Sequence, residues 1–170
     1  MLAPMSRSEL FSADVSTAAA LEAALSEFPD VIGGLRRVNQ AAWGAVDPDL
    51  LELCRLRVAM LLGCTAELAE RTAHTGVPET TVAELGNWPS STMFDSRSRS
   101  CLAFCEQFVI DVANLSDNQA GDVREHLGNE GFANFVSALL VIEQRQRLRL
   151  AWQQVFGTPT ASSKGQAHDS

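Results

Sequence analysis

The sequence predicts an all-α protein of about six to eight helices. Apolar residues recur at helical spacing along most of the chain, and no segment has the alternation of apolar and polar residues that is typical of strands. Proline, glycine and N-cap residues divide this pattern into separate segments. With 170 residues, 46% of them hydrophobic, the chain has the size and composition of one globular domain. We expect a single domain over residues 1–157 and a disordered tail over residues 158–170.

Two segments near the amino-terminal end predict a helical hairpin. Residues 16–28 are rich in alanine and are followed by Pro29. Residues 31–43 continue the helical pattern, although Gly33 and Gly34 weaken their helical propensity.

The clearest helix start lies at Asp47. Asp47 is a suitable N-cap, Pro48 fits the first helical position, and acidic residues follow in the early turns. Apolar residues then recur on one face as far as Leu62, so we expect a helix that is buried on one side. Gly63 interrupts the pattern.

Shorter helices are expected in the middle of the chain, over about residues 64–74 and 78–86. A longer helix follows, which is capped by Asp95 or Ser96 and carries an apolar stripe.

Two further helices complete the expected fold. Ser116 and Gln119 have the spacing of a capping box, which predicts a helix that ends near Leu127. The last helix is expected over about residues 130–156.

Charge and composition disfavour several classes of function. The 13 lysines and arginines and the 21 aspartates and glutamates give a net charge of −8, which disfavours binding to nucleic acid and to anionic membranes. No apolar run approaches the roughly 18 residues that a membrane span needs, and the amino-terminal residues lack the pattern of a secretory signal. We therefore expect a cytoplasmic protein.

The spacing of the four cysteines matches neither a zinc site nor a small disulfide scaffold, and we expect no metal or other cofactor. Cys54, Cys101 and Cys105 lie on apolar stripes, where buried core thiols are expected.

Cys64 lies in a different setting, within the stretch LLGCTAELAERTAHTG at residues 61–76. On one helix, Cys64, Glu67 and Arg71 would share a face. The start of a helix favours a thiolate, whereas a nearby carboxylate disfavours it unless a cation neutralises that carboxylate. These three residues are candidate catalytic residues. The plainer alternative is that Glu67 only caps the helix and forms an ordinary surface pair with Arg71.

A resemblance to a known family lies in residues 47–78, which read DPDLLELCRLRVAMLLGCTAELAERTAHTGVP. This stretch resembles the carboxymuconolactone decarboxylase and alkylhydroperoxidase AhpD superfamily, and the likeness in helical layout extends over roughly residues 28–156. The resemblance implies an AhpD-like helical fold and a homo-oligomer, commonly a trimer or hexamer.

In AhpD-like peroxidases a glutamate precedes a CxxC motif, and a histidine follows it. The resemblance places Glu52 at that glutamate and Cys64 at the first cysteine. It places Glu67 at the second cysteine and Arg71 at the histidine. Without the second thiol the intramolecular disulfide cannot form, and arginine stays protonated and cannot act as a base. These two differences from the family motif argue against a standard peroxidase cycle.

Three functions remain as hypotheses. The first is a cofactor-free lyase of the carboxymuconolactone decarboxylase-like branch, acting on a small carbonyl, lactone or carboxylate substrate. In it, Glu67 and Glu52 transfer protons and Arg71 binds the anion, with Cys64 adjacent. The second is a thiol-dependent peroxidase or redox protein with an antioxidant role that uses Cys64. The third is a non-catalytic oligomeric binding protein that retains the scaffold.

The last helix carries one polar interruption, EQRQR at residues 143–147. Gln146 should face the same way as Leu139, seven residues earlier. The run either lines a pocket or a subunit contact, or emerges into solvent with Glu143 and Arg147 as an i,i+4 pair.

Overall fold

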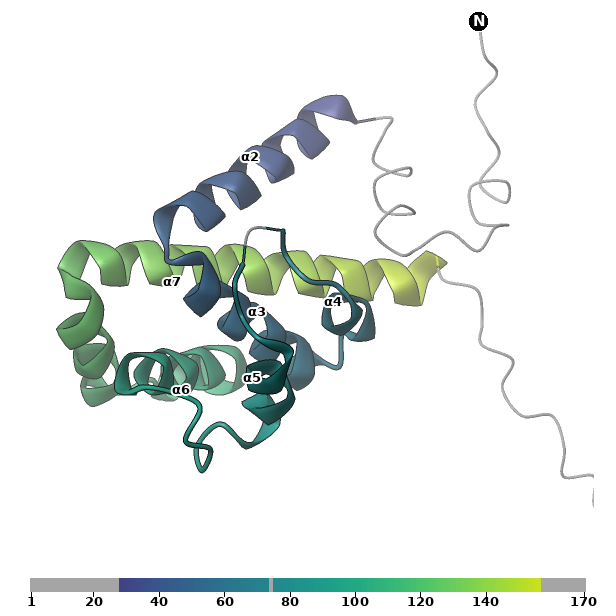
Figure 1. Ribbon diagram of the computed structural model, residues 1–170. Helices are drawn as coiled ribbons and strands as arrows, with labels where there is room; N and C mark the ends of the chain where they lie inside the picture. Colours follow the sequence, from purple (N-terminus) through teal and green to yellow (C-terminus); the bar gives the residue numbers. More distant parts are fainter. Residues whose placement is uncertain (1–27, 74, 157–170) are drawn as a thin grey trace, which may run out of the picture.

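A computed structural model describes residues 28–73 and 75–156, and every regular element in these ranges is a helix (Figure 1). The expected all-α fold is confirmed. The α-helices are α2 (Pro29–Ala45), α3 (Pro48–Leu62), α4 (Thr65–Ala69), α5 (Glu79–Glu84), α6 (Ser96–Asp111) and α7 (Asp117–Phe156), and two 3-10 turns are η1 (Leu85–Asn87) and η2 (Val112–Asn114). The expected helix at residues 16–28, except for Phe28, and the expected tail at 158–170 lie outside the described residues.

Helix α3 lies at the centre of the fold and packs against α6, α7 and α4. The sequence predicts that only one side of it is buried. The structure differs, because every residue from Leu50 to Leu56 is buried, as are Val58 and Ala59. Two of these buried residues are charged, Glu52 and Arg55, and their mutual pairing makes burial on this side possible.

The ends of α3 follow the predicted signals. The side chain of Asp47 accepts hydrogen bonds from the backbone N–H groups of Asp49, at 3.0 Å, and Leu50, at 3.4 Å. Gly63 ends the helix in the left-handed conformation, with φ of 69°, which glycine adopts at little cost.

Helix α4 is shorter than the sequence predicts. It ends at Ala69 instead of near residue 74, and Glu70 is extended, with φ of −93° and ψ of 149°. The guanidinium of Arg55 donates to the backbone carbonyls of Glu67 and Glu70, at 2.8 and 2.9 Å. These carbonyls are thereby satisfied by a buried side chain, so the chain can leave the helix without losing hydrogen bonds.

Helix α7 is two helical arms that meet at Gly128, where φ is 70° and ψ is 175°. This break agrees with the two separate helices that the sequence predicts on either side of residues 128–129. The first arm starts at the predicted capping box, in which the Ser116 Oγ accepts from the Gln119 N–H at 3.2 Å and the Gln119 side chain accepts from the Ser116 N–H at 3.0 Å. The second arm is the long helix that runs beneath α2 in Figure 1.

In residues 28–73 and 75–156, no helix combines the length and the apolar character that crossing a membrane would require.

Candidate functional site

Glu52 and Arg55 form a buried bidentate ion pair on α3. The Nε of Arg55 donates to Glu52 Oε2 and its Nη2 donates to Oε1, both at 2.7 Å. The side chain of Arg55 is 4% exposed and that of Glu52 is 0% exposed. The same face of α3 is therefore polar within the core, and its charges are neutralised pairwise.

Glu67 on α4 extends this pairing from α3 to α7. Its Oε2 accepts from Arg55 Nη1 at 2.7 Å, and its Oε1 accepts from Arg149 Nη1. Arg145 lies further away, with its Nη2 at 3.8 Å from Glu67 Oε1. Glu67 thus contacts three arginines although it lies 12 residues from the nearest of them in sequence and 82 from the farthest.

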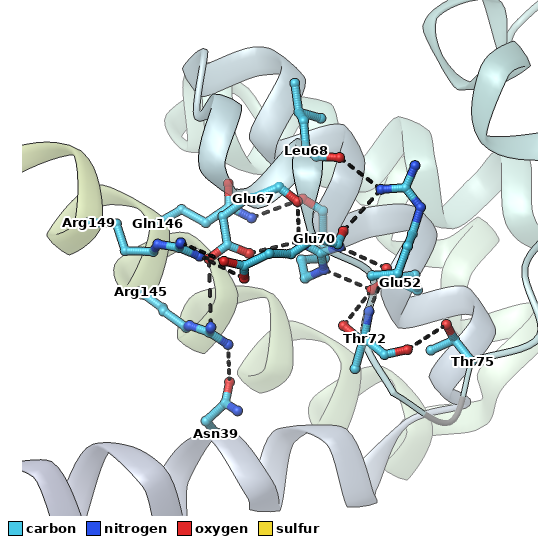
Figure 2. Close-up of polar contacts among 12 residues, drawn as sticks. Asn39, Glu52, Glu67, Leu68, Glu70, Thr72, Thr75, Arg145, Gln146 and Arg149 are labelled. Carbon is cyan, nitrogen blue, oxygen red and sulfur yellow. Dashed lines mark hydrogen bonds and ion pairs between the residues drawn. The ribbon is translucent and has the colours of Figure 1, made fainter. Parts of the chain in front are cut away.

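Arg149 and Glu70 complete the arrangement. Arg149 is buried, and its two terminal nitrogens donate to the carboxylate of Glu70 at 3.0 and 3.1 Å. In Figure 2 the side chains of Glu67, Glu70, Arg145 and Arg149 point toward one another. We call Glu52, Arg55, Glu67, Glu70, Arg145 and Arg149 the ion-pair cluster; its three carboxylates balance its three guanidinium groups.

The loop after α4 closes the cluster over Glu52. The backbone N–H of Thr72 donates to Glu52 Oε1 at 3.2 Å and its hydroxyl donates to Oε2 at 2.8 Å (Figure 2). Each oxygen of Glu52 therefore accepts one bond from Arg55 and one from Thr72.

Both central carboxylates have lowered pKa values. Burial by itself would raise the pKa of Glu67, but the charges and hydrogen bonds of Arg145, Arg149 and Arg55 outweigh burial and lower it. Burial would likewise raise the pKa of Glu52, and the bonds and charge of Arg55 with the bonds of Thr72 lower it. Both groups are therefore ionised at neutral pH and cannot donate a proton there.

The structure brings together two of the four residues that the sequence singles out. Glu52 and Glu67 meet on Arg55. Arg71 lies beyond the end of α4 and faces elsewhere: its guanidinium donates to both oxygens of Glu79, at 2.8 and 3.0 Å, near the surface. The shared helical face expected for Cys64, Glu67 and Arg71 is not formed, because α4 ends before Arg71.

Cys64 is the N-cap residue of α4 and is fully buried. Its backbone N–H donates to Ala59 O at 2.9 Å, which fixes the backbone of Cys64 at the turn that joins α3 to α4. The remaining cysteines, Cys54, Cys101 and Cys105, are buried core thiols as expected. The hydrogen bond with Cys105 and burial raise the pKa of Cys54, and burial raises the pKa of Cys101 to about 12.

Gln146 faces inward, as its spacing from Leu139 predicts. It is buried, and its Nε2 donates to the backbone carbonyl of Arg55 at 2.9 Å. Glu143 and Arg147 form the expected i,i+4 pair, at 2.8 and 3.0 Å.

Sequence reasoning missed four members of the cluster: Arg55, Glu70, Arg145 and Arg149. One signal was present for Arg149, because it follows Leu139, Ile142 and Gln146 at the same helical spacing and so belongs to the inward stripe of α7. For Arg55, the signal was its place three residues after Glu52 in a largely apolar helix, the spacing of an ion pair within one helix.

Within the described part of the chain, no group of three or more histidine, cysteine, aspartate or glutamate side chains is placed to hold a metal ion.

No family model and no curated protein matches the sequence. Among solved structures, the chain is similar to ATU0492 from Agrobacterium tumefaciens, a protein of unknown function described as a candidate antioxidant-defence protein AhpD. The likeness has a TM-score of 0.68 at 15% sequence identity and covers 76% of this chain and 92% of that chain. The chain has an AhpD-like fold. At this identity the likeness concerns the fold, and it agrees with the AhpD-like helical layout expected from residues 47–78.

Proposed function

We propose that this AhpD-like chain is a non-catalytic binding protein, in which the ion-pair cluster occupies the place of the thiol and proton relay of AhpD-like peroxidases. One observation carries the proposal: each oxygen of Glu52 and Glu67 already accepts a hydrogen bond from a buried arginine. A carboxylate held in this way stabilises the fold and has little capacity left for a substrate.

The pKa values support the same proposal. A general acid that works near neutral pH needs a raised carboxyl pKa, and the cluster lowers the pKa of both Glu52 and Glu67. The equal number of carboxylates and guanidinium groups also leaves no excess positive charge for an anionic substrate.

A peroxidase function has weaker support. ATU0492 is described as a candidate antioxidant-defence protein, and this description is the reason to consider peroxidase activity for this chain. However, Cys64 is fully buried, and the position of the second cysteine is taken by Glu67, which is bound to Arg55 and Arg149. A hydroperoxide cannot reach a thiol in this position without local opening.

The test is a thiol assay on the purified chain. We expect that a dithiol reductant and an organic hydroperoxide are consumed no faster with the protein than without it. We also expect that none of the four thiols reacts with a thiol reagent until urea unfolds the chain, because all four are buried. Hydroperoxide consumption that the Cys64→Ser variant loses would contradict the proposal.

A second function, acid–base chemistry on a small carboxylate or lactone, is favoured by the position of Arg145. Its side chain is 40% exposed, and its contacts are long, 3.8 Å to Glu67 and 3.4 Å to the side chain of Asn39. A substrate carboxylate that draws Arg145 away would lie next to Glu67 Oε1. Turnover of carboxymuconolactone that is lost in Arg145→Gln, while the variant keeps its helical circular dichroism, would establish this second function in place of the first.

A further inference from the structure

Gln146 and Arg149 each present a buried polar atom that has no hydrogen-bond partner among the residues that the structure describes. These atoms are Gln146 Oε1 and Arg149 Nε, and the two residues are 1% and 2% exposed. Burial of a polar atom without a hydrogen bond is unfavourable, and nearly all such atoms in folded proteins are paired with protein or with ordered water. Each atom therefore requires a partner other than a group of residues 28–73 or 75–156.

The other polar atoms of both side chains are fixed by hydrogen bonds. The Nε2 of Gln146 donates to the backbone carbonyl of Arg55 at 2.9 Å, and the opposite orientation of the amide would place two acceptors together. The terminal nitrogens of Arg149 donate to the carboxylates of Glu67 and Glu70. Neither side chain can therefore turn toward another partner without the loss of these bonds.

The two side chains lie close together on α7. Residues that are three apart in a helix are neighbours on its surface, with Cβ atoms roughly 5–6 Å apart. Gln146 reaches a carbonyl of α3 and Arg149 reaches a carboxylate of α4, and Figure 2 shows both side chains extending from α7 toward these helices. A small group between them can therefore contact both Oε1 and Nε.

The two atoms have opposite hydrogen-bonding character. Gln146 Oε1 is an acceptor and requires a donor, whereas Arg149 Nε carries a hydrogen and requires an acceptor. An oxyanion such as a carboxylate only accepts, and an ammonium group only donates, so neither ion satisfies both atoms. A hydroxyl group satisfies both, because its oxygen accepts and its hydrogen is donated.

The charges around the two atoms favour the same uncharged group. The three carboxylates of the ion-pair cluster are balanced by its three guanidinium groups. An additional ion would therefore be buried without a counter-charge, which is costly. A hydroxyl group brings no charge, and water in protein interiors commonly bridges polar atoms that have no other partner.

We propose that Gln146 Oε1 and Arg149 Nε form a binding site for one hydroxyl group, that of an ordered water molecule or of a small uncharged alcohol. The inference rests on the proposed binding function and deepens it, because it names the chemical group that the chain holds. Its tests detect occupancy at two atoms, whereas the thiol assay measures turnover, so either proposal can fail without the other.

The first test is a crystal structure of the full chain at a resolution that shows ordered water. One set of crystals is grown without alcohol, and a second set is soaked in ethanol. We expect electron density within hydrogen-bond distance of both atoms. A single oxygen in both sets identifies water as the source of the hydroxyl group, and ethanol in the second set shows that an alcohol also binds. The proposal is overturned by density for an anion such as chloride, by the absence of density at the two atoms, or by a direct bond of either atom to a protein group.

The second test measures nuclear Overhauser effects between water and arginine Nε–H groups by NMR. The Nε–H of Arg149 should show such an effect, whereas that of Arg55, which is also buried but donates to Glu52 at 2.7 Å, should show none. Gln146→Met removes the acceptor and should abolish the effect at Arg149. Arg147→Gln alters an exposed neighbour on the same helix and should preserve it.

The comparison of Arg55 with Arg149 needs only the native chain, so the test does not depend on the folding of a variant. Equal effects at the two arginines, or no effect at Arg149, would contradict the proposal. An effect at Arg149 that a folded Gln146→Met variant keeps in full would contradict it as well.

Discussion

At the scale of single residues, Glu67 is the member of the cluster that contacts the most arginines. Its charge is balanced by Arg55 and Arg149, which are themselves buried. Replacement of Glu67 by glutamine keeps the size of the side chain but leaves these guanidinium groups without their full counter-charge. We therefore predict that Glu67→Gln lowers the free energy of unfolding in urea by about 3–5 kcal/mol.

Glu79→Gln is the matched control, because Glu79 also binds an arginine but is 72% exposed. Water replaces the lost contact at such a site, so the urea midpoint of this variant should stay close to that of the native chain. Equal losses of stability in the two variants would contradict the role given to the buried cluster.

The lowered pKa values of Glu52 and Glu67 predict how stability depends on pH. Each folded pKa lies below the value of about 4.3 for a glutamate in an unfolded chain. The unfolded chain therefore binds more protons in this range, and the stabilisation is present above about pH 5 and lost as the pH falls through the folded pKa values. Urea unfolding between pH 7 and pH 3 should show a steady loss of stability. This dependence on pH should persist in high salt, because buried ion pairs are weakly screened. A stability that is constant or rises on acidification would contradict this account.

Residue patterns identified the two central carboxylates but not their partners. The resemblance over residues 47–78 pointed to Glu52 and Glu67, and the structure joins them through Arg55. Helical spacing paired Glu67 with Arg71, four residues later, whereas the arginine at Glu67 Oε1 is Arg149, 82 residues away. Sequence spacing gives neighbours along one helix, and it does not give which distant helix packs against them.

At the scale of elements, Gly128 decides the shape of α7. Its φ of 70° with ψ of 175° lies in a region that is almost restricted to glycine. We predict that Gly128→Ala lowers the free energy of unfolding by about 1–3 kcal/mol. Gly121→Ala, in the first arm of the same helix, should instead raise it by about 0.5–1 kcal/mol, because alanine is favoured in a helix interior.

These two substitutions form a matched pair. A Cβ at either glycine meets no atom within 4 Å, so steric overlap is the same and only the backbone conformation differs. Thermal or urea unfolding measures both, and a stabilising Gly128→Ala would show that the two arms of α7 can form one continuous helix.

Helix starts were more predictable than helix ends. Asp47, Asp95 and Ser116 act as caps where the sequence placed them, because a cap is a local interaction between neighbouring residues. The end of α4 was not predictable in this way. It depends on Arg55, which lies on another helix. The guanidinium of Arg55 donates hydrogen bonds to the backbone carbonyls of Glu67 and Glu70.

At the scale of the whole molecule, the ion-pair cluster connects three helical segments across the core. Glu52 and Arg55 lie on α3, Glu67 and Glu70 at α4, and the remaining arginines on α7, with Asn39 of α2 beside Arg145. The apolar pattern was sufficient to predict an all-α fold, and the resemblance over residues 47–78 implied the AhpD-like helical layout. It could not predict that the polar positions inside this layout would be occupied by paired charges, because pairing is a property of the assembled fold.

The protonation of Glu67 tests the central claim most directly. The measurement is a pH titration of the Glu67 side-chain carboxyl group by carbon NMR, with its resonance assigned by through-bond correlation. The ion-pair cluster predicts a pKa below the ordinary value of about 4.3 and an ionised group throughout the neutral range. A pKa of about 6 or above is the range of a catalytic carboxylic acid. Such a value would contradict the claim that the ion-pair cluster keeps Glu67 ionised, and it would indicate an acid–base site.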